Sequence, residues 1–119
     1  MKYKLTENKL KHNGKTLYQI QSLKDFGNVK AGDLGGWVES EKNLSQEDNC
    51  WIYNEAWVYG DARVSGNAQV YDNARIYSEA WVGGNARVYD NARVCGDVWI
   101  HDNARLSGDV RISGDGWIK

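Results

Sequence analysis

A six-residue period runs from residue 48 to residue 119 of this 119-residue chain and constrains its fold more than any other feature. From residue 48 onward the sequence divides without insertion into 12 hexapeptides, of which residues 60–65, Gly-Asp-Ala-Arg-Val-Ser, are typical. The fifth position of each hexapeptide is always aliphatic, and the third is always small or short. Such a unit is too short to bury a core alone, so the period predicts that neighbouring units stack.

The order small, variable, aliphatic predicts a short strand with two side chains facing inward and one facing outward. The remaining three positions include the Gly, Asn, Asp and Ser residues that tolerate tight corners. Three hexapeptides then close a triangular coil of 18 residues, and residues 18 apart should stack. They do resemble one another, in rows formed by Asn49, Asn67, Asn85 and Asn103, by Asp61, Glu79, Asp97 and Asp115, and by Tyr53, Tyr71 and Tyr89.

These repeats resemble the hexapeptide-repeat left-handed β-helix family, and residues 58–63, Val-Tyr-Gly-Asp-Ala-Arg, fit its pattern except at the second position. The resemblance implies an all-β fold, a left-handed parallel β-helix of about four triangular coils. The left hand is implied by the family alone, because the general crossover rule favours the other hand. Residues 32–39, Gly-Asp-Leu-Gly-Gly-Trp-Val-Glu, resemble the leading segment of uncharacterised bacterial and phage-type repeat proteins, which suggests a phage or mobile-element origin.

The chain is expected to form one structural unit with two parts. Residues 1–47 form an N-terminal cap and lead-in, and residues 48–119 form the β-helix. Strand-like segments flank Asn13-Gly14, which is a β-hairpin signal. Because a solenoid exposes sheet edges at both ends, we expect the hairpin to cap the N-terminal end and another subunit to cover the C-terminal end or a flat face.

The fourth position of each hexapeptide points outward, so stacking assigns it to one of three faces. The first face carries Trp51, Gln69, Arg87 and Arg105. The second carries Trp57, Arg75, Arg93 and Arg111. The third carries Arg63, Trp81, Trp99 and Trp117, with His101 beside them. An exposed apolar strip usually marks a contact with another molecule.

Self-association into a dimer or trimer through the three tryptophans is the favoured interpretation. The alternatives are cross-strand stacking that only stabilises the sheet, and the binding of a heterologous protein or a planar ligand. We therefore predict a non-enzymatic protein-binding or scaffold module. Its candidate contact residues are Trp81, Trp99, Trp117, Arg63, His101, Arg75, Arg93 and Arg111.

The arginine rows also raise the hypothesis of nucleic-acid binding. Their spacing of about 4.8 Å is shorter than the phosphate step of an extended strand, and acidic residues outnumber basic ones in the repeats. Both observations argue against nucleic acid. We expect the acidic corners and the arginines to neutralise one another on a solvated surface.

The two activities that the family resemblance brings into question both need histidines, and this sequence contains two. The family's acyltransferases use an imidazole base near a loop extruded from a coil, and its anhydrase-like members bind zinc through three imidazoles. This chain has only His12 and His101, and no loop interrupts the repeats. We therefore keep an acyltransferase-like enzyme only as the alternative to the non-enzymatic module. Neither a cofactor nor a metal is expected.

The expected location is the cytoplasm. Cys50 and Cys95 lack CxxC spacing and are compatible with a reducing compartment. No run of apolar residues approaches the roughly 20 that span a bilayer, so no membrane partner is expected.

Overall fold

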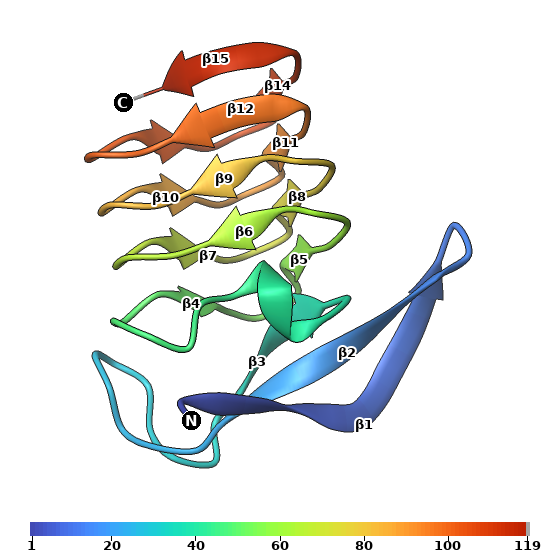
Figure 1. Ribbon diagram of the computed structural model, residues 1–119, viewed down its shortest axis with the longest axis vertical. Coiled ribbons are helices and arrows are strands. Elements are labelled where there is room, and N and C mark those ends of the chain that lie inside the picture. Colours follow the sequence, from blue (N-terminus) through green and yellow to red (C-terminus); the bar gives the residue numbers. More distant parts are fainter. Residues whose placement is uncertain (119) are drawn as a thin grey trace.

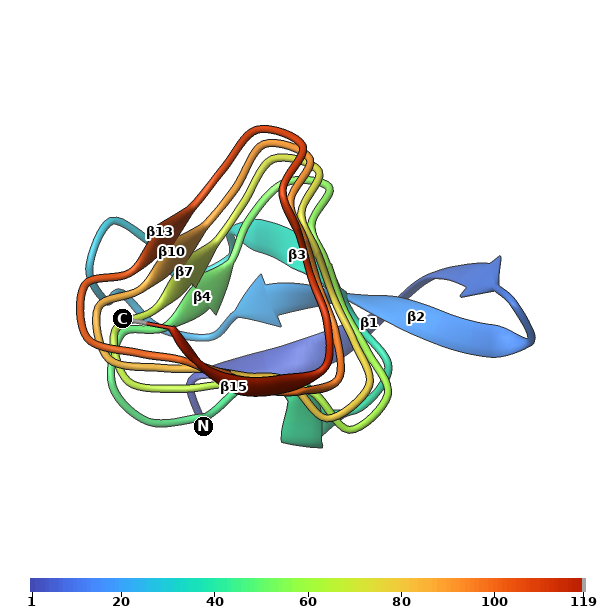
Figure 2. The ribbon, with the colours of Figure 1, turned by 90° about the horizontal axis from the view of Figure 1, so that it is seen from above.

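The computed structural model describes residues 1–118, in which an N-terminal antiparallel hairpin precedes a parallel β-solenoid with a triangular cross-section (Figures 1 and 2). The molecule extends 35 × 32 × 22 Å along its principal axes. Apart from one turn of 3₁₀ helix, η1 (Glu41–Asn43), the regular structure in the described chain is entirely β. The all-β solenoid predicted from the period is confirmed. No helix among these residues is long and apolar enough to cross a bilayer.

Each side of the triangle is one sheet of stacked strands. The side flanked by the Asn49–Asn103 row, here called the asparagine face, contains β4 (Trp51–Ile52), β7 (Gln69–Val70), β10 (Arg87–Val88) and β13 (Arg105–Leu106). The tryptophan face contains β6 (Arg63–Val64), β9 (Trp81–Val82), β12 (Asp97–Ile100) and β15 (Asp115–Ile118). The hairpin face contains β1 (Tyr3–His12), β2 (Lys15–Ser22), β3 (Leu34–Val38), β5 (Trp57–Val58), β8 (Arg75–Ile76), β11 (Arg93–Val94) and β14 (Arg111–Ile112).

Strands of successive repeat coils pair in parallel at an offset of 18 residues, as in Trp81↔Trp99 and Arg93↔Arg111. Side chains at equivalent positions therefore stand directly above one another. In Figure 1, the strands of the tryptophan face point to the left while the chain climbs from its N-terminus. The path of the chain in Figures 1 and 2 is left-handed.

The solenoid begins earlier than residue 48. β3 pairs in parallel with β5 through Trp37↔Trp57, and Leu44 bridges to Val64. Residues 34–47, which the sequence grouped with the cap, therefore form two sides of an additional coil. The chain makes about five turns, so the expected count of four was wrong. The hexapeptide count missed this coil because it stacks at an offset of 20 residues and includes η1.

The core lies along the axis of the triangle. From Ile52 through Ile100 each fifth-position side chain is at most 1% exposed, and the alanines between them are equally buried. Val110 and Ile112, in the last described coil, are half-buried. The aliphatic positions thus point inward, as the pattern predicts.

The first position of each hexapeptide has positive φ, as in Asn54 (58°) and Gly84 (60°). Asn and Asp are enriched among non-glycine residues with positive φ, and glycine adopts it without strain, which explains the Gly, Asn and Asp at these corners but not Ser78. A Cβ on Gly84 would lie 2.7 Å from the backbone nitrogen of Asp102 in the next coil. The corner therefore limits both the backbone conformation and the size of the residue.

The N-terminal hairpin turns at Asn13-Gly14, where the sequence predicts it, with His12 opposite Lys15. Its proximal half closes the base of the solenoid, where Tyr3 and Ile20 are fully buried. The distal half projects beyond the triangular outline in Figures 1 and 2. The hairpin is thus part cap and part arm.

Candidate functional site

The tryptophan face carries a column of stacked indoles. The rings of Trp81 and Trp99 lie 5.0 Å apart at an interplanar angle of 3°, and those of Trp99 and Trp117 lie 5.8 Å apart at 8°. The parallel register of β9, β12 and β15 places one indole on each coil. Their exposed fractions are 43%, 43% and 71%. The predicted vertical alignment of the three tryptophans is present.

A row of carboxylates runs beside this column, from Asp61 through Glu79 and Asp97 to Asp115. Lys42 donates to Asp61 at 2.7 Å, and this hydrogen bond and its charge lower the pKa of that carboxyl. One coil higher, a hydrogen bond with Asp97 and its negative charge raise the pKa of Glu79. The lower end of the row is therefore neutralised, whereas the next coils have a surplus of negative charge.

Lys42 is a contact that the sequence reasoning missed. It lies in η1, outside the hexapeptide register, so the 18-residue stacking rule makes no statement about it. The acidic row, Arg63 and the indoles together line an open groove of about 430 Å³, whose wall is formed by Asp61, Arg63, Glu79, Trp81, Asp97 and Trp99.

Two further candidate residues lie at the ends of the indole column. The Arg63 guanidinium carbon is 5.8 Å from the Trp81 ring centre, within the range of a cation–π contact. His101 packs edge-on against Trp117 at 5.7 Å, and its Nδ1 lies 3.2 Å from Asp102 Oδ1. Its Nε2 is buried and has no hydrogen-bond partner among the described residues. The fold thus brings Arg63 and His101 together with the three tryptophans.

The other three candidates, Arg75, Arg93 and Arg111, lie on the hairpin face, away from the indole column. Arg75 stacks on Trp57 at 3.9 Å and donates to three backbone carbonyl oxygens, whereas Arg93 and Arg111 are exposed. No arginine of residues 1–118 lies within ion-pair distance of a carboxylate. The expected neutralisation between acidic corners and arginines therefore does not operate through direct ion pairs in the described chain, and several corner carboxylates bond elsewhere.

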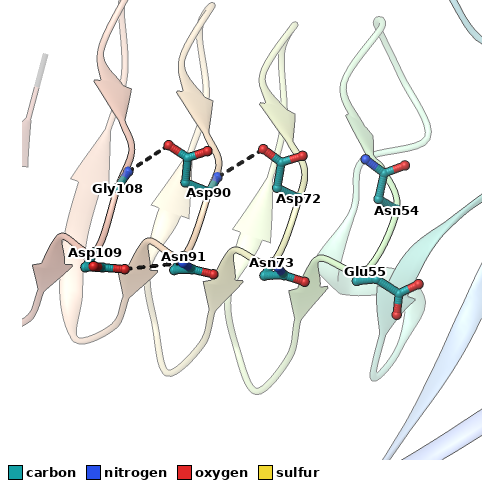
Figure 3. A pocket seen from close by; sticks show the side chains of 8 residues that line it. All are labelled: Asn54, Glu55, Asp72, Asn73, Asp90, Asn91, Gly108 and Asp109. Atoms are coloured by element: carbon teal, nitrogen blue, oxygen red, sulfur yellow. Dashed lines mark hydrogen bonds between the residues drawn. The ribbon is translucent and has the colours of Figure 1, made fainter.

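The corner between the asparagine and hairpin faces shows where those carboxylates go (Figure 3). The Asp90 backbone N–H donates to Asp72 Oδ2 at 3.3 Å, and the Gly108 N–H donates to Asp90 Oδ2 at 2.9 Å. Asn91 Nδ2 donates to Asp109 Oδ1 at 3.3 Å. Each group links one coil to the next, so this concave corner is structural. Over residues 1–118, no three His, Cys, Asp or Glu side chains form a group that could hold a metal ion.

Comparison with known proteins extends the picture of the repeats. The family model described as the YdcK Beta solenoid repeat matches residues 68–84 and 86–102, which include Trp81, Trp99 and His101. The protein named "Uncharacterized acetyltransferase YdcK" of Escherichia coli (strain K12) is 51% identical to this chain over 39 residues. That segment is 33% of this chain and 12% of the relative. The matches support a β-solenoid repeat protein, and the chain corresponds to a small part of the relative's length.

Proposed function

We propose that the protein is a non-enzymatic scaffold that self-associates through its tryptophan face. The observation that carries the proposal is the column of near-parallel indoles, which remain exposed while the adjacent aliphatic positions Val82 and Ile100 are buried. Tryptophan is enriched among the residues that contribute most to protein interfaces. Because stacking already holds these rings in place, a partner would order few side chains on binding.

Sheet stabilisation alone accounts less well for this surface. Cross-strand aromatic pairs contribute about 0.2–1 kcal/mol each. The other two faces form such pairs from the smaller tyrosines, as Tyr59–Tyr77 and Tyr71–Tyr89 do. Tryptophans at the outward position of three successive coils leave much more apolar surface in water than stacking requires.

Sedimentation velocity over a concentration series of the 119-residue chain tests the proposal. Trp99→Asp places a charge in the centre of the column and is expected to keep the chain monomeric at concentrations where the wild type associates. Leu23→Asp is the matched control, since Leu23 is 45% exposed and lies in the loop before β3. A folded Trp99→Asp variant with the wild-type mass distribution, or a wild type that stays monomeric throughout, would contradict the proposal.

Acyl transfer is the second candidate function, favoured by the name of the relative and by the His101–Asp102 pair. A carboxylate on Nδ1 orients an imidazole so that Nε2 can take a proton from an acceptor group. The acyl group would then pass from a thioester sulfur to that acceptor, and the thiol would leave. Burial of Nε2 opposes this role as the residue stands. Turnover of acetyl-coenzyme A that His101→Gln abolishes would establish it, and silence of the wild type would exclude this acyl donor.

A further inference from the structure

The three faces of the solenoid differ in charge. The tryptophan face has four carboxylates in the row beside its outward column. The asparagine face has no carboxylate in its outward column or in the row on either side of it, within the described coils. Its outward column is Trp51, Gln69, Arg87 and Arg105, flanked by Asn49, Asn67, Asn85 and Asn103 on one side and by Tyr53, Tyr71, Tyr89 and Ser107 on the other. The tryptophan face is therefore acidic beside its indoles, and the centre of the asparagine face is basic, with its nearest carboxylates at the corner positions Asp48, Asp72, Asp90 and Asp102.

Arg87 and Arg105 are unengaged cations on that basic face. They pair in register on β10 and β13, and both side chains are exposed. Neither side chain forms an ion pair or a hydrogen bond with another described residue. Beside them, Tyr71 and Tyr89 stack at 4.9 Å with an interplanar angle of 1°. The surface thus offers two aligned guanidinium groups and a flat aromatic pair.

The spacing of the two columns favours a particular occupant. The indole column of the tryptophan face and the arginine column of the asparagine face both repeat once per coil, at the distance of about 4.7–4.9 Å that separates paired strands. In an extended peptide laid along the column, every second side chain points to the same side, so these side chains are about 6.6–6.8 Å apart. They would fall out of register with the column within two coils. Another β-ladder keeps register at every step. A second copy of this chain carries such a ladder on its asparagine face.

The chain itself contains small examples of the contacts that would form. Arg75 stacks on Trp57 at 3.9 Å on the hairpin face, and Arg63 lies 5.8 Å from Trp81 on the tryptophan face. Outward arginines of this solenoid therefore do pack against outward indoles. Lys42 on Asp61 shows the acidic row accepting a cation. Among the described residues no lysine or arginine lies within ion-pair distance of Glu79 or Asp97, and the hydrogen bond with Asp97 and its charge raise the pKa of Glu79. Guanidinium groups from outside would meet both the indoles and these carboxylates.

We infer that the partner of the tryptophan face is the asparagine face of a second copy, with Arg87 and Arg105 of one copy packed against Trp81, Trp99 and the Glu79–Asp97 carboxylates of the other. This inference rests on the proposed self-association and names its second surface. The contact is heterologous, because two different faces meet. Heterologous contacts build rings or open chains of subunits, whereas a face that pairs with itself builds a twofold dimer.

Complementation between two variants tests the inference by sedimentation velocity. Trp99→Asp has an intact asparagine face, and the double variant Arg87→Glu/Arg105→Glu has an intact tryptophan face. Each alone is expected to be monomeric, with self-affinity reduced about tenfold or more. An equimolar mixture is expected to form a one-to-one heterodimer that grows no further. Lys4→Glu/Lys9→Glu, which makes the same charge change on the exposed part of the hairpin, is expected to assemble as the wild type does.

The outcomes separate the two levels of the account. If folded Trp99→Asp assembles normally, the proposed self-association through the tryptophan face fails. If Trp99→Asp is monomeric but Arg87→Glu/Arg105→Glu assembles normally, the proposed function stands and the inference is overturned. The variant Arg93→Glu/Arg111→Glu tests the sequence-based expectation for the hairpin face. Loss of assembly in that variant alone would likewise overturn the choice of the asparagine face. Circular dichroism of each variant checks its fold.

Discussion

Trp51 and Trp99 occupy the same position of the hexapeptide in two regions of the solenoid, yet their environments are opposite. At the base, Trp51 is 1% exposed and packs edge-on against Tyr3 at 6.1 Å and Phe26 at 5.3 Å. In the repeat coils, Trp99 stacks flat between two other indoles and is 43% exposed. The repeat determines the direction in which a side chain points. The unique N-terminal segment decides whether that side chain is covered.

The largest expected difference between the two regions is in the free energy of unfolding. Trp51→Ala should lower it by about 3–5 kcal/mol, because the change leaves a cavity in the sealed base. Trp99→Ala should lower it by about 1 kcal/mol, since only stacking contacts are lost. Urea denaturation monitored by circular dichroism measures both. Equal losses would contradict the distinction between a sealed base and an exposed face.

Lys2 gives a second way to probe the base. It is 1% exposed, and its Nζ donates to the carbonyl oxygens of Cys50 at 2.8 Å, Glu47 at 3.1 Å and Asp48 at 3.3 Å. Lys2→Met should cost about 2–3 kcal/mol of unfolding free energy, because these buried acceptors lose a charged donor. Lys4→Met, at an exposed position of β1, should change it by less than about 0.5 kcal/mol. A Lys2 variant as stable as its control would show that the contacts contribute little.

The regular coils could be predicted from the sequence in detail, and the base could not. Twelve equivalent positions report the same inward direction, so the period defines the core, the faces and the alignment of Trp81 with Trp99. The positions of Lys2 and Asn43, by contrast, have no equivalents in the other coils. Asn43 is fully buried and bonds to four backbone groups, those of Glu39, Ser40, Gly60 and Ala62. No periodicity distinguishes such residues from exposed polar ones.

The candidate site was predicted in the same uneven way. The stacking rule brought the three tryptophans, Arg63 and His101 onto one face. It could not find Lys42, which reaches Asp61 from η1. It also could not choose between the basic columns as a candidate surface, because that choice depends on the charges in the adjacent rows and on which arginines are engaged within the chain.

The smallest expected effect concerns the acidic row and its dependence on pH. The folded chain raises the pKa of Glu79, so its protonated form stabilises the fold below the unfolded pKa of about 4.3, and this contribution is lost as the pH rises through the folded value. Glu79→Gln should therefore be more stable than the wild type at neutral pH and equal to it in acid. Asp61→Asn should be less stable than the wild type at neutral pH and equal to it in acid, because Lys42 lowers the pKa of Asp61. Urea midpoints at both pH values measure these signs, and a stabilising Asp61→Asn would contradict the assignment.

The central claim is that the indole column is the surface on which copies of this chain meet. The indole N–H resonances of the six tryptophans, followed by nuclear magnetic resonance in a dilution series, test it most directly. The account predicts that the signals of Trp81, Trp99 and Trp117 shift or broaden with concentration while that of buried Trp51 does not. Concentration-dependent changes confined to Trp37 or Trp57, or no change in any of the six, would contradict it.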